Sequence, residues 1–135
     1  MPNCVLDTDV VIAALDRADP HHAAASAAFE GLVSTRTELL VCTVNYAEAL
    51  VRPAEDERTM RAAVDAIASL GIRTIAPDAT LARNAAHHRG LGISLADGFA
   101  LATAERADAD LASFDKRVRR ALKVLDLRLS PELER

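Results

Sequence analysis

The 135-residue sequence predicts an α/β fold with a parallel sheet covered by helices on both faces. Short apolar runs alternate along the chain with longer helical segments, and the connections between them are brief. In such βαβ units each parallel strand is followed by a helix that crosses back over the sheet. The length suits one domain, residues 1–135, and no repeat, low-complexity stretch or linker divides it.

The first unit begins at the N-terminus. Residues 3–6 form a short apolar run that ends at Asp7, which is typical of a buried strand. From Val10 the apolar residues continue into a helix. Asp19-Pro20 predicts the start of a second helix, with Asp as the N-cap and Pro in the first turn.

The second unit has one strand and two helices. Residues 39–42 are the predicted strand, and Thr43 is expected to cap a helix that stops near Pro53. Residues 56–70 are predicted to be helical, with Gly71 as the C-terminal cap.

The third unit starts with a predicted strand at residues 72–76. Pro77-Asp78 then opens a helix that ends near Gly90, and residues 94–107 form another helix.

The C-terminal unit contains the fourth predicted strand, residues 109–114, followed by Asp115 and a basic segment. Residues 123–127 are a candidate fifth strand. The tail, residues 130–135, is expected to form a short helical turn or to be frayed.

The composition is that of an ordinary globular protein, with 50% hydrophobic and 27% charged residues. Aromatic residues make up only 3%, so the core must consist of Ala, Val, Leu and Ile. Cys4 and Cys42 lie in apolar runs and are interpreted as small buried hydrophobes rather than a disulfide.

No apolar run reaches the roughly 18 residues that span a bilayer. The segment Met1-Pro2-Asn3-Cys4 has no basic stretch and does not resemble a signal peptide. The expectation is a cytoplasmic protein without a membrane partner.

Four acidic residues, Asp7, Glu48, Asp97 and Asp115, lie beside predicted strand ends or helix starts. In an open α/β sheet, residues beyond the carboxyl ends of the strands converge in one crevice. Four carboxylates there would repel one another unless a cation neutralised them. The first hypothesis is therefore a hard divalent metal ion and chemistry on an anionic substrate.

Three of these acids also have structural explanations. Asp7 or its neighbour Asp9 can cap a helix, and Asp115 can be a turn residue. Ser94 and Asp97 have the spacing of a capping box. Beside Asp97, a glycine inside the helix indicates close backbone packing.

Glu48 is distinguished by its neighbours. Val44, Glu48 and Val51 are spaced to share one helix face, which places the carboxylate beside apolar residues. The alternative is a glutamate at the edge of the apolar stripe that reaches out to water.

The net charge of −4, from 16 basic and 20 acidic residues, does not by itself indicate binding to nucleic acid. A basic run after Asp115 is usually a solvated helix face, but beside a carboxylate cluster it could bind phosphates. The candidate phosphate contacts are Arg52, Lys116, Arg117, Arg119 and Arg120. His21-His22 and His87-His88 are interpreted as surface residues, because adjacent residues on a helix do not share a face.

Four segments together resemble PIN-domain ribonucleases, and specifically VapC-type toxins of VapBC toxin–antitoxin pairs. They are VLDTDVVIAAL, TVNYAEALVRP, ISLADGFALATA and LASFDKRVRR. The resemblance covers nearly the whole chain and assigns the acidic positions of the family to Asp7, Glu48, Asp97 and Asp115, with Ser113 as the hydroxyl residue of the last motif. Asp9 departs from the family pattern, which often has Ser or Asn there, and is a secondary candidate that binds metal through water or caps the helix.

The resemblance implies a three-layer α/β/α fold with a central parallel sheet of four to five strands. It also implies an endoribonuclease that depends on Mg²⁺, with Mn²⁺ as an alternative, and whose metal polarises a phosphodiester oxygen and orients a water for in-line attack. The implied partners are an RNA substrate, a second copy of the chain in a homodimer, and a VapB-like antitoxin whose C-terminal segment covers the site.

Two other functions are compatible with parts of the sequence. Asp7-x-Asp9 after a strand resembles the nucleophile motif of haloacid-dehalogenase-like phosphatases, but the required lysine could only be Lys116 or Lys123, near the end of the chain. A receiver-like signalling module would use Asp7 and Asp9 as an acidic pocket and Asp78 as the phosphate acceptor, which leaves Glu48 and Asp97 without a role.

Overall fold

The computed structural model describes residues 2–134, in which four parallel strands form a sheet of order β3–β2–β1–β4. The strands are β1 (Asn3–Leu6), β2 (Glu38–Cys42), β3 (Ile72–Ile75) and β4 (Asp110–Ala112). Met1 and Arg135, the two ends of the predicted domain, lie outside the described residues.

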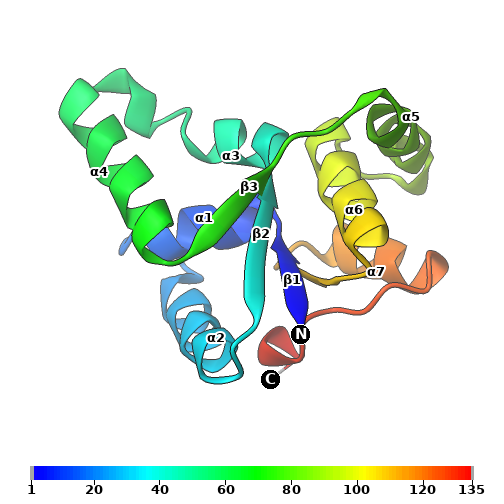
Figure 1. The fold of residues 1–135 in the computed structure, drawn as a ribbon, viewed down its shortest axis with the longest axis horizontal. Coiled ribbons are helices and arrows are strands. Elements are labelled where there is room, and N and C mark those ends of the chain that lie inside the picture. The colour runs from blue at the N-terminus through cyan, green and yellow to red at the C-terminus, as the bar shows by residue number, and fades with distance from the viewer. Residues whose placement is uncertain (1, 135) are drawn as a thin grey trace.

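Helices cover both faces of this sheet and confirm the predicted three-layer α/β/α architecture (Figure 1). They are α1 (Thr8–Leu15), α2 (His22–Ser34), α3 (Thr43–Ala49), α4 (Glu57–Ser69), α5 (Ala79–His88), α6 (Leu95–Ala107) and α7 (Lys116–Val124). Short 3-10 turns occur at Pro53–Glu55, Arg89–Leu91 and Pro131–Leu133. In Figure 1, α1, α2 and α4 lie on one side of the strands and α5, α6 and α7 on the other.

The side chains of the central strands alternate between two cores. Leu6 and Val41 pack with residues of α1, α2 and α4, whereas Val5, Leu40 and Leu111 pack with α6 and α7. Because successive strand residues point to opposite faces and both faces are covered, the strands are apolar almost throughout. This explains why the sequence shows them as continuous apolar runs.

The predicted fifth strand, residues 123–127, is wrong. Lys123 is in the last turn of α7, whose buried stripe of Val118, Ala121 and Leu122 has helical spacing. The chain returns to the sheet only as a single parallel bridge between Leu129 and Leu111.

The tail behaves largely as expected. Pro131–Leu133 forms the predicted short helical turn, and Leu133 is buried. The last residue of the predicted tail, Arg135, lies outside the described part of the chain.

Two helix starts differ from expectation. The Asp19 carboxylate accepts the backbone N–H of His21 at 2.8 Å in a turn, so α2 begins only at His22 and Asp19 does not cap it. Thr43 is the first residue of α3 rather than its cap, because the backbone becomes helical directly after Cys42. Both differences are shifts of one to three residues at a helix end, where boundaries are hardest to predict.

Other local predictions are confirmed. The side chains of Asp78 and Ser94 each accept a backbone N–H and cap α5 and α6. Asp56, predicted as the first helical residue, is instead the N-cap of α4. Gly71 ends the α4 segment with a φ of 78°.

Gly98 allows α5 and α6 to pack closely, as its position inside a helix indicated. A Cβ at this position would lie 2.5 Å from the carbonyl oxygen of Ala85 on α5. Cys4 and Cys42 are both buried and unpaired, which confirms their interpretation as core residues, and burial raises the pKa of Cys4 to about 12. Among residues 2–134, no helix is long and apolar enough to cross a membrane.

Candidate active site at the carboxyl edge of the sheet

The carboxyl ends of β1 and β4 bring together residues more than a hundred positions apart. The backbone N–H of Asp7 donates to the carbonyl of Ala112 at 2.9 Å, which extends the strand pairing by one step. Directly beyond it, the Ser113 hydroxyl donates to Asp7 Oδ2 at 2.8 Å, and both side chains are buried. The pairing of β1 with β4 thus forms the centre of the predicted crevice.

Asp7 is the N-cap of α1, one of the two roles that the sequence offered for it. Its Oδ1 accepts the backbone N–H of Thr8 at 2.9 Å and so caps α1. The side chain is also almost inaccessible, with 1% of its residue surface exposed. Burial raises the pKa of Asp7 well above its ordinary value, and the charges of Asp9 and Asp97 raise it further against the opposing bonds from Ser113 and Thr8.

Asp9 is held toward the same place from α1. Its Oδ2 accepts the backbone N–H of Phe114 at 3.0 Å, whereas Oδ1 is buried and has no hydrogen-bond partner among residues 2–134. Burial raises the pKa of Asp9 to about 6, and the charges of Asp115 and Asp97 add to this against the bond from Phe114. An aspartate that the sequence marked as secondary is therefore one of the two most perturbed acids.

Asp97 enters the cluster at the start of α6. The capping box is formed, with Asp97 N–H donating to Ser94 Oγ at 3.1 Å and Ser94 N–H donating to Asp97 Oδ2 at 3.3 Å. Its charge nevertheless acts on Asp7 and Asp9. The capping bonds orient the Asp97 carboxylate at this edge, and they are compatible with metal binding by the same carboxylate.

Asp115 caps α7 on the other side. Its Oδ1 accepts the backbone N–H groups of Arg117 at 2.7 Å and of Val118 at 3.4 Å. Burial alone would raise the pKa of Asp115, but hydrogen bonds from the backbone and side chain of Arg117 and from Val118 outweigh it and lower the pKa. Asp115 is therefore charged more readily than Asp7 or Asp9.

Glu48 is the fourth acid that the sequence predicted for the site. It is an exposed residue of α3 and lines a groove of about 620 Å³ between α1 and α4, together with Arg52 and Asp16. The prediction that Val51 shares its face is wrong, because α3 ends at Ala49 and Val51 is 64% exposed.

Sequence reasoning missed Asn45, which is fully buried behind the cluster. Its Nδ2 donates to Thr8 Oγ1 at 3.1 Å and to the carbonyl of Ala96 at 3.0 Å, and so ties together α1, α3 and α6. Its Oδ1 is buried without a partner in the described chain. The available signal was the spacing of Asn45 and Ala49 on one buried helix face, which a polar residue occupies only when it is hydrogen-bonded.

The basic candidates fall into three environments. Lys116, Arg117 and Arg120 are exposed on α7, away from its buried stripe. Arg119 is half-buried and donates from Nε to the carbonyl of Ser113 at 2.9 Å and from Nη2 to that of Leu133 at 3.4 Å. Arg52 is exposed in the groove that contains Glu48.

The histidine prediction holds for three residues and is wrong for His88. His21 and His87 are exposed and His22 is half-buried, but His88 is buried and pairs with Glu105 of α6. Adjacent helical residues do point to different faces, and for this pair one of the two faces is the α5–α6 interface.

No three acidic, histidine or cysteine side chains of residues 2–134 converge tightly enough to form a ready-made metal site. The donor chemistry nevertheless fits a hard cation. Asp9 Oδ1 and Asn45 Oδ1 are buried oxygens without hydrogen-bond donors, and the buried Asp7 has charged neighbours of the same sign. A cation that binds oxygen ligands could be the missing partner of such oxygens, and it would offset the negative charge around Asp7.

The sequence model of the PIN domain matches residues 4–123. The chain belongs to the PIN domain family. The match includes the four aspartates at the carboxyl edge, and it confirms the family that the four sequence segments indicated. No protein with a curated description matched the chain.

Several solved structures share this fold. VapBC2 from Rickettsia felis, bound to a DNA fragment of its promoter, is 17% identical, with a TM-score of 0.73 over 95% of this chain and 97% of that one. VapC20 from Mycobacterium tuberculosis, described as a sarcin–ricin-loop-cleaving toxin, is 17% identical, with a TM-score of 0.70 over 87% and 94%. FitAcB from Neisseria gonorrhoeae is 20% identical, with a TM-score of 0.70 over 98% and 99%. At these identities the likeness shows a shared fold.

Proposed function

We propose that this PIN domain is a metal-dependent endoribonuclease and acts as the VapC-type toxin of a type II toxin–antitoxin pair. The observation that carries the proposal is the set of Asp7, Asp9, Asp97 and Asp115 at one sheet edge, two of them with raised pKa values. Carboxylates held this way in a nuclease family favour metal-assisted hydrolysis of a phosphodiester.

The proposed metal ligands are Asp7, Asp97 and Asp115, with Glu48 acting through water from the neighbouring groove and Asp9 as an additional ligand. Mg²⁺ suits this set because it binds few carboxylates and keeps several waters, and Mn²⁺ accepts the same oxygen ligands. When bound, the ion would polarise a phosphodiester oxygen and order a water for in-line attack.

The protein itself contributes orientation. The Ser113 hydroxyl and the Thr8 N–H hold one oxygen each of Asp7, and the Phe114 N–H holds one oxygen of Asp9. These bonds leave Asp9 Oδ1 without a donor at the same edge. Asn45 supports this arrangement from behind by joining Thr8 to the start of α6.

RNA is the proposed substrate, and the exposed cations next to the acids support this. Lys116 and Arg117 directly follow Asp115, and Arg120 continues the same exposed side of α7. Their charges would offset the repulsion between the acidic edge and the phosphates on either side of the cleaved bond. Arg52 offers a further contact from the groove, and Arg119 positions the backbone after β4.

The proposed partners are a second copy of the chain and a VapB-like antitoxin whose C-terminal segment covers the acidic edge. The solved VapBC and FitAB complexes with this fold support an antitoxin partner. An RNA-cleaving activity also requires a compartment that contains RNA, so the cytoplasmic location expected from the sequence belongs to the same proposal.

The two other functions fit the structure less well. Asp78, the acceptor that a receiver module would need, caps α5 and pairs with Arg106 at 2.8 Å. The lysine that the phosphatase needs could only be Lys116 or Lys123, and both side chains are exposed on α7.

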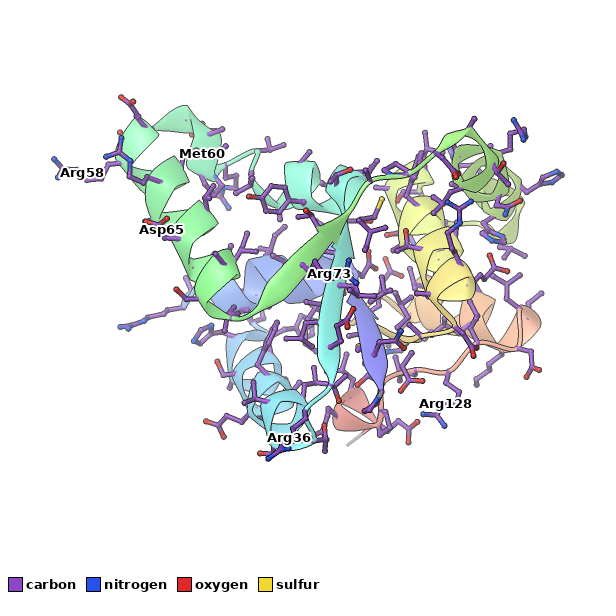
Figure 2. The ribbon with its side chains drawn as sticks, viewed as in Figure 1. Arg36, Arg58, Met60, Asp65, Arg73 and Arg128 are labelled. Carbon is purple, nitrogen blue, oxygen red and sulfur yellow. The ribbon has the colours of Figure 1, made fainter. Side chains whose placement is uncertain are left out.

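The first test is cleavage of total cellular RNA by the purified chain in Mg²⁺, in EDTA, and by the Asp97→Asn variant. The asparagine side-chain oxygen can still accept the backbone N–H of Ser94, so the variant removes the charge and retains the capping box. Asp65→Asn on α4 is the matched control, since Asp65 is an exposed aspartate on the outer helix (Figure 2).

Discrete fragments that require the metal and Asp97, and that persist in Asp65→Asn, would support the proposal. A folded wild-type protein free of antitoxin that leaves RNA intact in every lane would contradict it. Transfer of phosphate to Asp7 from a phosphomonoester would then favour the phosphatase.

A further inference from the structure

Two aromatic rings stack at the surface beside the acidic edge. The imidazole of His21 and the ring of Phe114 have centroids 4.3 Å apart and planes only 8° from parallel. His21 is exposed at the start of α2, and Phe114 is half-buried after β4. We call this pair the aromatic platform. Because His21 is exposed, its ring can stack with a further planar group on the face opposite Phe114.

The aromatic platform is fixed relative to the acids by the backbone. Phe114 lies between Ser113, which binds Asp7, and Asp115, and its own N–H donates to Asp9 at 3.0 Å. A nucleotide whose phosphate lies at the carboxylates would therefore have a neighbouring base within reach of the platform. The side chain of Phe114 also packs against the main core, which limits its movement.

A cavity of about 310 Å³ adjoins the platform and contains groups that suit the edge of a base. His21, Phe114, Arg119 and Glu132 line it, with Ala24 and Leu133 among the apolar residues. Arg119 is anchored through Nε and Nη2 to two backbone carbonyls, so its guanidinium is already positioned. The carboxylate of Glu132 disfavours a phosphate, whereas a base presents both donors and acceptors at its edge.

This site stands out because the chain has few aromatic residues. Phe29 is buried in the core, while Phe99 and Tyr46 pack against core clusters. Phe114 differs from these three residues because it directly precedes Asp115 and stacks on an exposed ring, that of His21. Bases of single-stranded nucleic acid bind such surfaces by stacking, whatever their sequence.

We infer that the aromatic platform binds an unpaired base of single-stranded RNA next to the cleaved phosphodiester, with the edge of that base toward Arg119. The inference rests on the proposed nuclease function and adds to it a substrate conformation, because a base in a duplex is not free to stack on a side chain. It predicts that the chain binds single-stranded RNA more tightly than helical RNA although it has few aromatic residues.

The test measures RNA binding in the Asp97→Asn background with Mg²⁺, in which the RNA stays uncut. The probes are a fluorescently labelled single-stranded RNA of about 12 nucleotides and an RNA backbone of the same length without bases. The readout is fluorescence anisotropy over a range of salt concentrations. His21→Ala removes the exposed ring, His21→Phe retains it, and His87→Ala is the control, an exposed histidine on α5.

The expected result is that His21→Ala raises the Kd for the base-containing RNA about tenfold, a typical value for loss of one base–aromatic stack. The salt slope should not change, since no phosphate contact is lost. His21→Phe should restore binding, and on the RNA without bases all three variants should bind equally.

An equal Kd for His21→Ala and His87→Ala would overturn the inference. So would a salt slope reduced by about one together with failure of His21→Phe to restore binding, since His21 would then contact a phosphate. If His21→Ala weakened antitoxin binding and left RNA binding unchanged, the platform would be a protein-docking surface instead. If the wild-type protein cleaves RNA but the expected binding results are not obtained, the inference about the platform is wrong and the nuclease function still stands.

Discussion

Acidic residues have different partners at the two ends of the parallel sheet. At the amino ends, Glu38 of β2 lies 2.5 Å from Arg73 of β3, and Asp110 of β4 forms a two-pronged ion pair with Arg128 at 3.0 Å. Both arginine side chains are mostly exposed, and Figure 2 shows Arg128 at the periphery of the molecule. Each of these acids has an arginine partner.

At the carboxyl ends Asp7 is buried and Asp9 is half-buried, and neither forms an ion pair with a cationic side chain among residues 2–134. Asp7 and Asp9 receive only hydrogen bonds from neutral donors, and Asp97 adds a third negative charge nearby. Buried charges without a partner are costly and would be removed by selection unless they had a use. We therefore infer that the acids at the carboxyl edge lower the stability of the fold and are retained for a function.

The largest expected effect is the loss of activity in Asp7→Asn. Asparagine can cap α1 and fit the same space, so the fold should remain while the RNA cleavage rate falls by roughly 10³-fold, as for loss of a main electrostatic contact. The measurement is the cleavage rate in Mg²⁺, with thermal unfolding as the check on folding. Asp110→Asn at the opposite end of the sheet is the control and should cleave as wild type does.

The second prediction concerns pH and Asp9. Its pKa of about 6 in the folded protein is above the ordinary value of 3.8, so the folded state binds this proton more tightly than the unfolded chain. The stabilisation is complete below a pH of about 4 and is lost as the pH rises to about 6. At neutral pH without metal, Asp9→Asn should therefore be more stable than wild type, by up to about 3 kcal/mol.

Chemical unfolding at several pH values in EDTA would measure this difference. The advantage of Asp9→Asn should vanish near a pH of about 4, and added Mg²⁺ should reduce it at neutral pH by stabilising the wild type. An advantage independent of both pH and metal would mean that the charge of Asp9 is not the cause.

A third prediction tests whether the acidic edge depends on the packing of α6. Gly98→Ala would place a Cβ 2.5 Å from the carbonyl of Ala85, so α6 must move away from α5. We expect a loss of about 2 kcal/mol in the free energy of unfolding and a weaker activity, because Asp97 precedes this residue. Ala102→Gly, also on α6, is a comparison that should lose stability without moving the start of the helix.

The smallest effect is expected at the amino ends. Arg128→Gln removes an exposed ion pair and should change the free energy of unfolding by less than about 1 kcal/mol, and less still in high salt. RNA cleavage should be unaffected. A loss of stability as large as that of Gly98→Ala would show that the two ends of the sheet are not as different as the contacts indicate.

Much of the candidate site could be predicted because its markers are local. Asp7 and Asp115 follow strand ends, and Ser94 with Asp97 has capping spacing, so their positions at one edge follow from the order of strands and helices. The role of Asp9 was harder to predict, since its partner Phe114 is 105 residues away.

Predictions failed where packing between distant segments decides. The residues 123–127 do not indicate by themselves that α7 continues to Val124. They also do not indicate that Leu129, further along the chain, pairs with β4. The same holds for His88, whose burial depends on how closely Gly98 lets α6 approach α5.

By itself the sequence determined the order of strands and helices, most helix caps, and the presence of aspartates at the strand ends, because periodicity and capping act over a few residues. Only the tertiary structure decided which acids lose their solvent, that Asn45 supports them, and that His21 stacks on Phe114. These properties depend on burial and on contacts between elements far apart in the chain, and burial is what turns an ordinary aspartate into one with a raised pKa.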